Sequence, residues 1–191
     1  MKPQKPEWER STRVCSTVGL QPDLLATLRA YLEEHELGAV EAQALVCFET
    51  VSRRTVKAGL LLRLGGAGHK LVTQAVIVTP TRLVWAQRTD DDAPIARSEL
   101  LAGLEVADYE KSPAFALLPD HGVEVSGVDA GQGTTGTLFF GLGEGPDSGH
   151  ARQILKDAVR AAHGEGPPVA RPGGETSGDA PGGSSESAPP A

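Results

Sequence analysis

Short runs of β-forming residues, separated by turn signals, occupy the middle of the chain from Ala42 to about Phe140. Each run is rich in Val, Ile, Thr, Leu or aromatic residues, and the runs are 44–51, 59–64, 71–79, 82–87, 94–99, 104–110, 122–128 and 136–142. The turn signals between them include Gly-Gly-Ala-Gly at 65–68, Thr-Pro-Thr at 79–81 and Asp-Ala-Gly-Gln-Gly at 129–133. Frequent turns between short strands are typical of antiparallel sandwiches and barrels. The pattern therefore predicts a mainly β fold, with a curved antiparallel sheet of about seven strands.

An amphipathic helix is predicted before the strands, over residues 21–38. Pro22 and Asp23 suit a first helical turn, and Gly38 lies just past the end. The apolar face holds Leu24, Leu25, Leu28, Tyr31 and Leu32. This face either packs back onto the sheet, or it binds a partner or dimerises with the anchors Leu24, Leu28, Tyr31 and Leu32.

A second helix is predicted at the other end of the folded region, over residues 148–163. Asp147 or Ser148 is a natural N-cap. Apolar residues recur at the spacing of one helical face, at Ala151, Ile154, Leu155, Ala158, Val159 and Ala162. A single helix with one apolar face must cover other apolar surface, and the strands provide it. We therefore expect this helix to cap the sheet.

The two ends of the chain differ in composition from its middle. Residues 164–191 contain seven Gly, six Pro and four Ser. Such a segment cannot bury enough apolar surface to offset the entropy of the chain, so it is predicted to be a disordered tail. Residues 1–20 are predicted to be a flexible N-terminus. One folded domain is then expected over residues 42–163, preceded by the helix at 21–38.

Charge and cysteine content limit the functional classes. The 191 residues carry a net charge of −7, which argues against a general nucleic-acid binder. Cys15 and Cys47 are too few for a disulfide framework, and Cys47 lies in an apolar run where a thiol acts as a small hydrophobe. No apolar run approaches the ~20 residues of a membrane span, and no apolar segment follows Lys2 and Lys5 as in a signal peptide. The chain is therefore expected to be a soluble, cytoplasmic protein.

The sequence offers few residues in patterns that support catalysis or metal binding. Gly-Leu-Gly-Glu-Gly at 141–145 departs from the dinucleotide fingerprint, because Pro146 stands where the third glycine is required. The five histidines are scattered, and the three consecutive acids at 90–92 form no evident cage. A Gly-x-Ser-x-Gly nucleophile motif is absent. We expect no enzyme activity, no metal site and no cofactor, and we expect Trp85 to belong to the core.

Three stretches of the middle region resemble the bacterial group of pleckstrin-homology-like (PH-like) domains. They are the strand, tight turn and strand at 75–86, the segment 95–109, and the closing strand and helix at 138–162. The resemblance covers residues 42–163 and implies a barrel or sandwich of about seven strands closed by a C-terminal helix. The helix at 22–36 lies outside it. Because this superfold hosts lipid, peptide and protein binding, the resemblance implies a binding module without choosing its ligand.

A basic cluster lies within residues 52–70, which hold no acid but hold Arg53, Arg54, Lys57, Arg63 and Lys70. In a PH-like meander, successive loops alternate between the two ends. This alternation predicts the first three of these residues at one end with Arg82, and Lys70 at the other end. The acids at 90–92 are also predicted at that other end. The cationic end is suited to an anionic headgroup or an acidic protein segment, whereas solvated loop charges are the simpler interpretation.

The expected function is a non-catalytic binding module that recognises a protein or peptide partner, or a second copy of itself. The alternative is peripheral association with an anionic membrane through Arg53, Arg54, Lys57 and Arg82. The Arg-x-Arg or Lys-x-Arg pattern of phosphoinositide-binding PH domains is absent, because Arg53 and Arg54 are adjacent. No nucleic-acid partner is expected.

Overall fold

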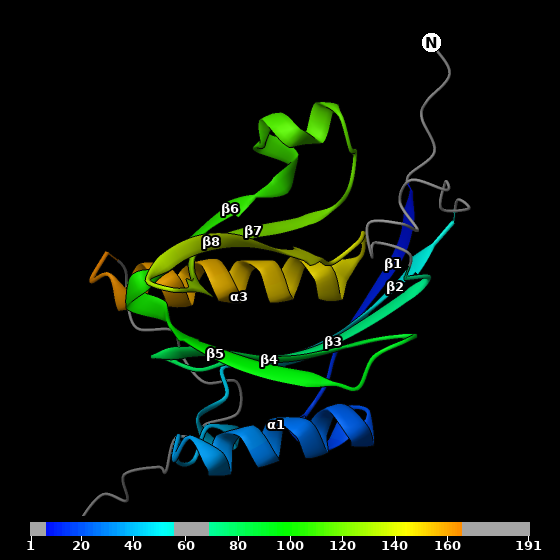
Figure 1. The fold of residues 1–191 in the computed structure, drawn as a ribbon. Helices are drawn as coiled ribbons and strands as arrows, with labels where there is room; N and C mark the ends of the chain where they lie inside the picture. Colours follow the sequence, from blue (N-terminus) through cyan, green and yellow to red (C-terminus); the bar gives the residue numbers. More distant parts are fainter. Residues whose placement is uncertain (1–6, 56–68, 166–191) are drawn as a thin grey trace, which may run out of the picture.

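The chain folds into three layers, as Figure 1 shows in a computed structural model that describes residues 7–55 and 69–165. Helix α1 (Pro22–Glu34) forms one outer layer and a five-stranded sheet forms the middle. Helix α3 (Pro146–Ala162) lies beside a three-stranded sheet in the third layer. The five-stranded sheet contains β1 (Trp8–Val14), β2 (Val46–Arg54), β3 (Leu71–Val78), β4 (Arg82–Thr89) and β5 (Ile95–Leu100). The three-stranded sheet contains β6 (Glu105–Asp108), β7 (Gly122–Gly131) and β8 (Thr134–Gly141).

Both sheets are antiparallel, and their strands follow the order of the chain. The predicted mainly β fold with a C-terminal helix and a further helix near the N-terminus is therefore confirmed, although strand β1 precedes that helix. The closed barrel is not formed, because within the described ranges no strand of one sheet pairs with a strand of the other. Seven of the predicted strand runs become β2 to β8, whereas the run at 59–64 lies outside the described residues. Among the described residues, no helix is long and apolar enough to cross a membrane.

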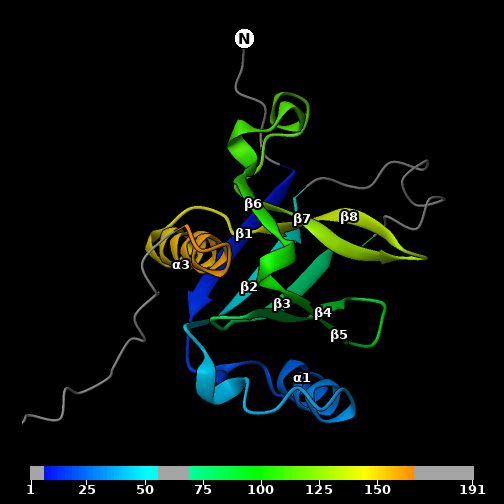
Figure 2. The same cartoon turned by 90° about the vertical axis from the view of Figure 1, so that its left-hand side faces the viewer.

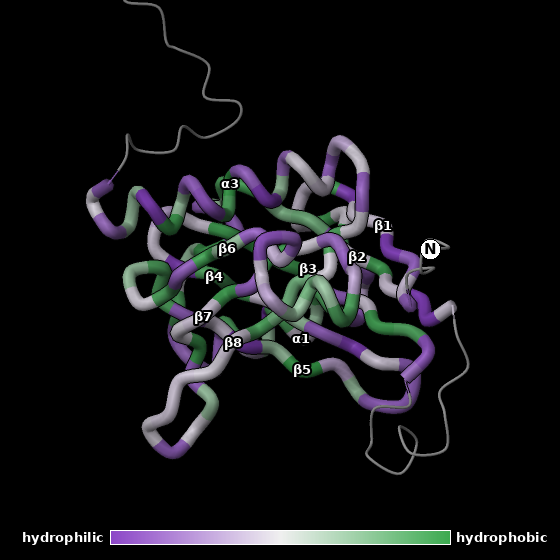
Figure 3. The backbone as a smooth tube through the Cα atoms, turned by 90° about the horizontal axis from the view of Figure 1, so that it is seen from above, coloured by the Kyte–Doolittle hydropathy of each residue, from purple (hydrophilic) through white to green (hydrophobic). Residues whose placement is uncertain are grey.

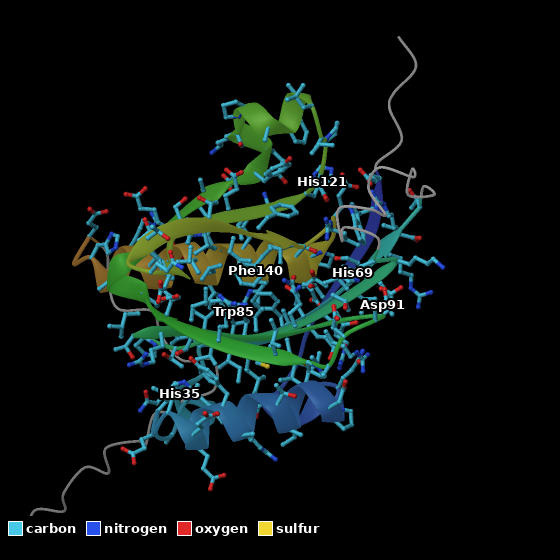
Figure 4. All side chains as sticks on the ribbon, viewed as in Figure 1. His35, His69, Trp85, Asp91, His121 and Phe140 are labelled. Atoms are coloured by element: carbon cyan, nitrogen blue, oxygen red, sulfur yellow. The ribbon has the colours of Figure 1, made fainter. Side chains whose placement is uncertain are left out.

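The five-stranded sheet is buried on both faces, because successive residues of β3 and β4 are apolar. One set faces the three-stranded sheet and α3, and consists of Val76, Val78, Leu83 and Trp85. The other set faces α1, and consists of Ala75, Ile77, Val84 and Ala86. Trp85 meets Phe140 of β8 edge-on between the two sheets, with ring centroids 6.0 Å apart (Figure 4). Trp85 and Cys47 are buried as predicted, and Figure 3 shows apolar segments in the centre of the molecule.

Helix α1 covers the outer face of the sheet with its predicted apolar side. Leu24, Leu28 and Leu32 are buried in the core between α1 and the sheet. They are therefore not available as anchors for a partner, and of the two interpretations of this helix, packing onto the sheet is the one observed. Tyr31 is half-buried, and its hydroxyl lies 3.2 Å from Ser98 Oγ on β5.

Strand β1 corrects the prediction of a flexible N-terminus over residues 1–20. Residues Trp8–Val14 pair with β2 along the whole length of the strand. Their sequence, Trp-Glu-Arg-Ser-Thr-Arg-Val, is mostly polar, so it lacks the apolar residues that identify the other strands. The polar side chains are satisfied by distant partners instead, since Arg10 pairs with Asp120, 110 positions along the chain. A polar sequence can therefore form a strand where the rest of the fold supplies partners for its side chains.

Helix α3 closes one side of the sandwich with its predicted apolar face. Its buried residues include Ala151, Leu155, Ala158 and Val159. The helix begins at Pro146, so the two expected capping residues lie inside its first turn. Asp147 accepts a hydrogen bond from the Val14 amide of β1, and Ser148 donates one to a carbonyl before the helix. Because α3 contacts β1 and β6, strands β5 and β8 form the open side of the described sandwich (Figure 2).

Candidate functional site

A pocket of about 290 Å³ lies between the start of β1, the end of β8 and the connection from β6 to β7. We call it the aromatic pocket, and its lining residues are Glu7, Trp8, Arg10, Tyr109, Leu117, Leu118, Pro119, Asp120 and Phe139. Its volume lies at the lower limit of ligand pockets in general, which matches one large side chain better than a cofactor. The lining residues come from four separate segments, so the pocket exists only in the folded chain.

Strand geometry places the aromatic walls of the pocket. Trp8 and Arg10 are two residues apart on β1 and therefore point to the same face of the strand. Phe139 comes from β8, and Tyr109 from the turn after β6, with their ring centroids 4.7 Å apart. The Tyr109 hydroxyl donates a 2.9 Å hydrogen bond to the carbonyl of Leu118. Burial, and then the nearby Asp120 carboxylate, raises the pKa of Tyr109, which keeps this donor protonated.

Arg10 forms the charged floor of the pocket and is fully partnered. Its guanidinium lies over the rings of Trp8 and Phe139, 5.3 and 5.2 Å from their centroids. Two of its nitrogens donate to the Asp120 carboxylate, at 2.8 and 2.6 Å, and a third donates to Ser52. The side chains of Arg10 and Asp120 are 11% and 15% exposed. The two charges neutralise each other, so the pair fixes the shape of the pocket and leaves no free charge to recognise an ion.

Gly141 gives Arg10 the space for this position. A Cβ atom at residue 141 would lie 2.2 Å from the Arg10 guanidinium, well inside van der Waals contact. Any larger residue at this end of β8 must displace the arginine or itself. Gly141, the first glycine of the Gly-Leu-Gly-Glu-Gly segment, thus helps to shape the pocket.

Two exposed leucines form the rim of the pocket. Leu117 is 78% exposed and Leu118 is 61% exposed, in a chain that buries most of its other described leucines. Exposed apolar surface that is contiguous with a pocket is a feature of interaction sites. The arrangement can accept an apolar side chain and cover it, since aromatic walls and leucines dominate the lining and the arginine–aspartate pair is internally neutralised.

The structure separates the residues of the predicted basic cluster. Arg53 and Arg54 lie at the end of β2 where Arg53 is opposite Leu71. Arg82 begins β4 at the other end of the sheet, so its predicted place beside them is wrong. Lys57 and Arg63 lie outside the described residues. The prediction assumed that the connection after Arg54 crosses to the other end of the sheet, whereas β2 and β3 are antiparallel neighbours, so β3 starts at the end where β2 stops.

Acidic residues occupy the same end as Arg53 and Arg54, which is the opposite of the prediction. The carbonyl of Lys70 accepts the Arg54 amide at 2.9 Å, so Lys70 also lies at this end. Asp90 accepts the amides of Lys70 and Leu71 at 3.1 and 3.5 Å. Desolvation alone would raise the pKa of Asp90, but these backbone hydrogen bonds lower it. Arg54 itself pairs with Glu7 and lies over Trp8, so this end of the sheet carries both signs of charge.

His69 lies beside the acids at 90–92, a contact that sequence spacing did not predict. Its Nδ1 atom is 3.6 Å from carboxylate oxygens of both Asp90 and Asp91 (Figure 4). The hairpin of β3 and β4 brings the two segments together, because Leu71 starts one strand and Thr89 ends the other. Exposed carboxylates beside a histidine are common without a bound ion, so we assign no metal to this cluster.

The residues of the aromatic pocket were not among the predicted site residues. Two signals for it exist in the sequence: Trp8 and Arg10 alternate on a short segment, and Leu117 and Leu118 stand in a connection that has no other reason to be apolar. Neither signal identifies a pocket alone, because the segments are about 100 residues apart and the fold must first join them. No protein-family model matches this sequence, and no curated protein matches it significantly. The function is therefore inferred from the geometry of the chain itself.

Proposed function

We propose that this chain is a non-catalytic binding module that recognises a protein or peptide partner through the aromatic pocket. The observation that carries the proposal is the exposed pair Leu117 and Leu118 beside a pocket already walled by Trp8, Tyr109 and Phe139. A side chain that enters this pocket removes apolar surface of both molecules from water. One large apolar side chain contributes about 1.5–3 kcal/mol when it is fully buried.

The order of the elements is consistent with a PH-like unit within the chain. Strands β2 to β5 form four successive neighbours, β6 to β8 form three, and α3 follows. This is the order that the resemblance over residues 42–163 implies, with β1 and α1 as additions before it. In this proposal β1 is more than an addition, because it supplies Trp8 and Arg10 to the pocket.

The partner class follows from the chemistry of the lining. Each charged residue of the described lining has a partner, since Arg10 pairs with Asp120 and Glu7 pairs with Arg54 of β2, so none of them is left to select a charged ligand. Aromatic and aliphatic surface remains, which suits a Leu, Ile, Met or aromatic side chain presented by a peptide segment. The lining residues that could act as an acid or a base, Glu7 and Asp120, are held in ion pairs, which supports a binding role over a catalytic one.

The membrane alternative receives less support from the same geometry. It depends on Arg53, Arg54, Lys57 and Arg82 acting together. Arg82 lies at the opposite end of the sheet, and Arg54 is engaged with Glu7. A cationic surface made of the remaining residues would be weak and screened beyond about 8 Å at physiological salt.

Peptide selection tests the proposal. The full chain is used to select binders from a random peptide library, and the affinity of the selected peptides is measured by calorimetry. We expect peptides with a large apolar residue, and we expect the double substitution Leu117→Ser and Leu118→Ser to weaken them by about tenfold or more. Val18→Ser is the matched control, because Val18 is 74% exposed and does not line the pocket.

Two outcomes would contradict the proposal. The first is a set of peptides that bind the wild type and the double leucine variant equally well. The second is retention of the chain by anionic vesicles at low salt that is lost on Arg53→Glu and unaffected by the leucine substitutions. The second result would transfer the function to the membrane alternative.

A further inference from the structure

The five-stranded sheet ends in an unpaired strand, β5. This strand pairs with β4 on one side, from Arg82 opposite Leu100 to Gln87 opposite Ile95. On its other side no described strand pairs with it, and Figure 2 shows it at the margin of the molecule. An open strand edge presents free backbone donors and acceptors, which is a template for pairing with another chain.

The hydrogen bonds of the sheet identify which backbone groups of β5 are free. The Leu101 amide donates to the Thr81 carbonyl at 2.9 Å, so residue 101 points its backbone groups toward β4. Because these directions alternate along an antiparallel strand, Ile95, Arg97 and Glu99 also bond to β4. The amides and carbonyls of Ala96, Ser98 and Leu100 therefore point outward. The Thr79 amide donates to the Arg82 carbonyl, so the backbone groups of Arg82 point toward β3. Those of Leu83, Trp85 and Gln87 then point toward β5, which agrees with the directions given for β5.

Large apolar side chains stand exposed at both ends of this edge. Ile95 is 55% exposed and Leu100 is 53% exposed, and together they account for two of the five exposed large hydrophobic residues in the described part of the chain. Natural edge strands are commonly protected by Lys, by Pro or by a covering element. Strand β5 contains neither Lys nor Pro, and no described strand covers its outer side. Its edge therefore combines free backbone groups with an apolar residue at each end and the charges of Arg97 and Glu99 between them.

The sequence of β5 is complementary to itself in the antiparallel direction. When two copies are paired about a two-fold axis at Ser98, Arg97 of each copy lies opposite Glu99 of the other. Opposite charges in such positions attract, because facing side chains on an antiparallel pair lie on the same face of the sheet. Leu100 of each copy then lies opposite Ala96 of the other, where the small alanine leaves space for the exposed leucine. The opposite charges, the fit of leucine against alanine and the outward backbone groups therefore all favour the register centred on Ser98.

We propose that this chain forms a two-fold symmetric homodimer by antiparallel pairing of β5 with β5 of a second copy, centred on Ser98. The outward groups of Ala96, Ser98 and Leu100 form about six main-chain hydrogen bonds across this contact. The two five-stranded sheets become one continuous sheet. The aromatic pocket is not involved, because it lies at the β1 edge of the sheet, so failure of the dimer leaves the proposed function untouched.

The mass of the full chain in solution tests the dimer. Sedimentation velocity is measured from about 1 µM to about 500 µM. We expect the mass to rise from that of one chain, 19.9 kDa, to twice that value. Ser98→Pro removes an outward amide without touching the bonds to β4, and proline is tolerated at such edge positions. We expect this variant to stay monomeric, and its matched control Ser98→Ala, which loses only the hydroxyl contact with Tyr31, to dimerise.

A charge exchange tests the register. Arg97→Glu places two glutamates opposite each other twice in the dimer, and we expect it to weaken association by about tenfold or more. Arg97→Glu combined with Glu99→Arg restores opposite charges, and we expect it to associate more tightly than either single variant. The Glu99→Arg single variant is the proper reference, because it equally loses the bond from the Asp129 amide to Glu99.

Three results would overturn the proposal. They are a full chain that stays monomeric throughout the concentration range, a dimer that persists in a folded Ser98→Pro variant, and a charge exchange that fails to rescue Glu99→Arg. Far-UV circular dichroism establishes whether Ser98→Pro folds. If it does not fold, the charge exchange decides alone, because neither of its positions changes the backbone.

Discussion

Gly141→Ala is expected to destabilise the fold by displacing Arg10. The new Cβ would stand 2.2 Å from the guanidinium carbon and one terminal nitrogen of Arg10. The end of a free arginine would move away at little cost. This one is held by two bonds to Asp120, one to Ser52 and the ring of Phe139. Relief of the clash therefore requires loss of the buried ion pair.

The structure gives the size of the effect. Breaking a buried ion pair while one charge remains costs about 3–5 kcal/mol. Because Arg10 and Asp120 are 11% and 15% exposed, solvent compensates part of this, and we expect about 3 kcal/mol. In a chain of this size, 1 kcal/mol lowers the melting temperature by about 2–4 °C, so the drop should be about 6–12 °C. A stability of about 5–15 kcal/mol leaves the variant folded.

A double-mutant cycle shows whether the cost comes from Arg10. Urea unfolding is followed through the fluorescence of the two tryptophans, one of which lies in the pocket. Arg10→Ala alone should also cost about 3 kcal/mol, because it leaves Asp120 unpaired. It also vacates the space that the alanine at position 141 needs. In that background Gly141→Ala should add less than about 0.5 kcal/mol, since the two changes remove the same interaction.

Gly127→Ala is the matched control for this cycle. A Cβ at residue 127 would lie 2.1 Å from the carbonyl oxygen of Gly103, which is backbone and makes no contact with Arg10. Its cost should therefore be the same with or without Arg10, within about 0.5 kcal/mol. Equal costs for Gly141→Ala in the two backgrounds would refute the reasoning, and so would a Gly127→Ala cost that disappears with Arg10.

Three further changes test the cores, the rim and the ion pairs. Leu28→Ala should cost about 2–5 kcal/mol in urea unfolding, because Leu28 is fully buried between α1 and the sheet. The double substitution Leu117→Ser and Leu118→Ser should change stability by less than about 0.5 kcal/mol, since both side chains are exposed, and a larger loss would make them structural. Although desolvation opposes it, hydrogen bonds from Arg152 lower the pKa of Glu110 below its ordinary 4.5. That contribution is present above pH 4.5 and is lost on acidification through the lowered pKa, so Arg152→Met should flatten the fall of the urea midpoint below pH 4.5.

Apolar periodicity predicted the strands and helices whose contacts are apolar. The sequence shows the apolar stripe of Leu24, Leu28 and Leu32 and the apolar runs of β3 and β4. These residues are buried in the core, and burial in the core requires apolar residue types. Strand β1 has no such stripe. Its Arg10 pairs with Asp120, 110 residues away, and this pairing cannot be predicted from the residues around Arg10.

The basic cluster shows a second limit of sequence reasoning. In a meander, the end at which a loop lies depends on the number of strands before it. The prediction placed a strand between Arg54 and Leu71, whereas β2 and β3 are antiparallel neighbours, so Arg82 and the acids at 90–92 were both assigned to the wrong ends. Which of these charged residues lie together depends on the register of β2 on β3, and that register is not visible in the local sequence.

The two proposed surfaces lie at opposite edges of one sheet, so neither proposal depends on the other. Strand β1 borders the aromatic pocket, and β5 carries the free edge, with three strands between them. A dimer made through β5 leaves each pocket open and turns both outward from the shared axis. Two pockets on one rigid ten-stranded sheet can engage a partner that presents two apolar segments, and the second contact then forms at high effective concentration. A pocket that holds a single side chain gives modest affinity alone. Pairing through β5 would raise the overall affinity for such a partner without any new contact in the pocket.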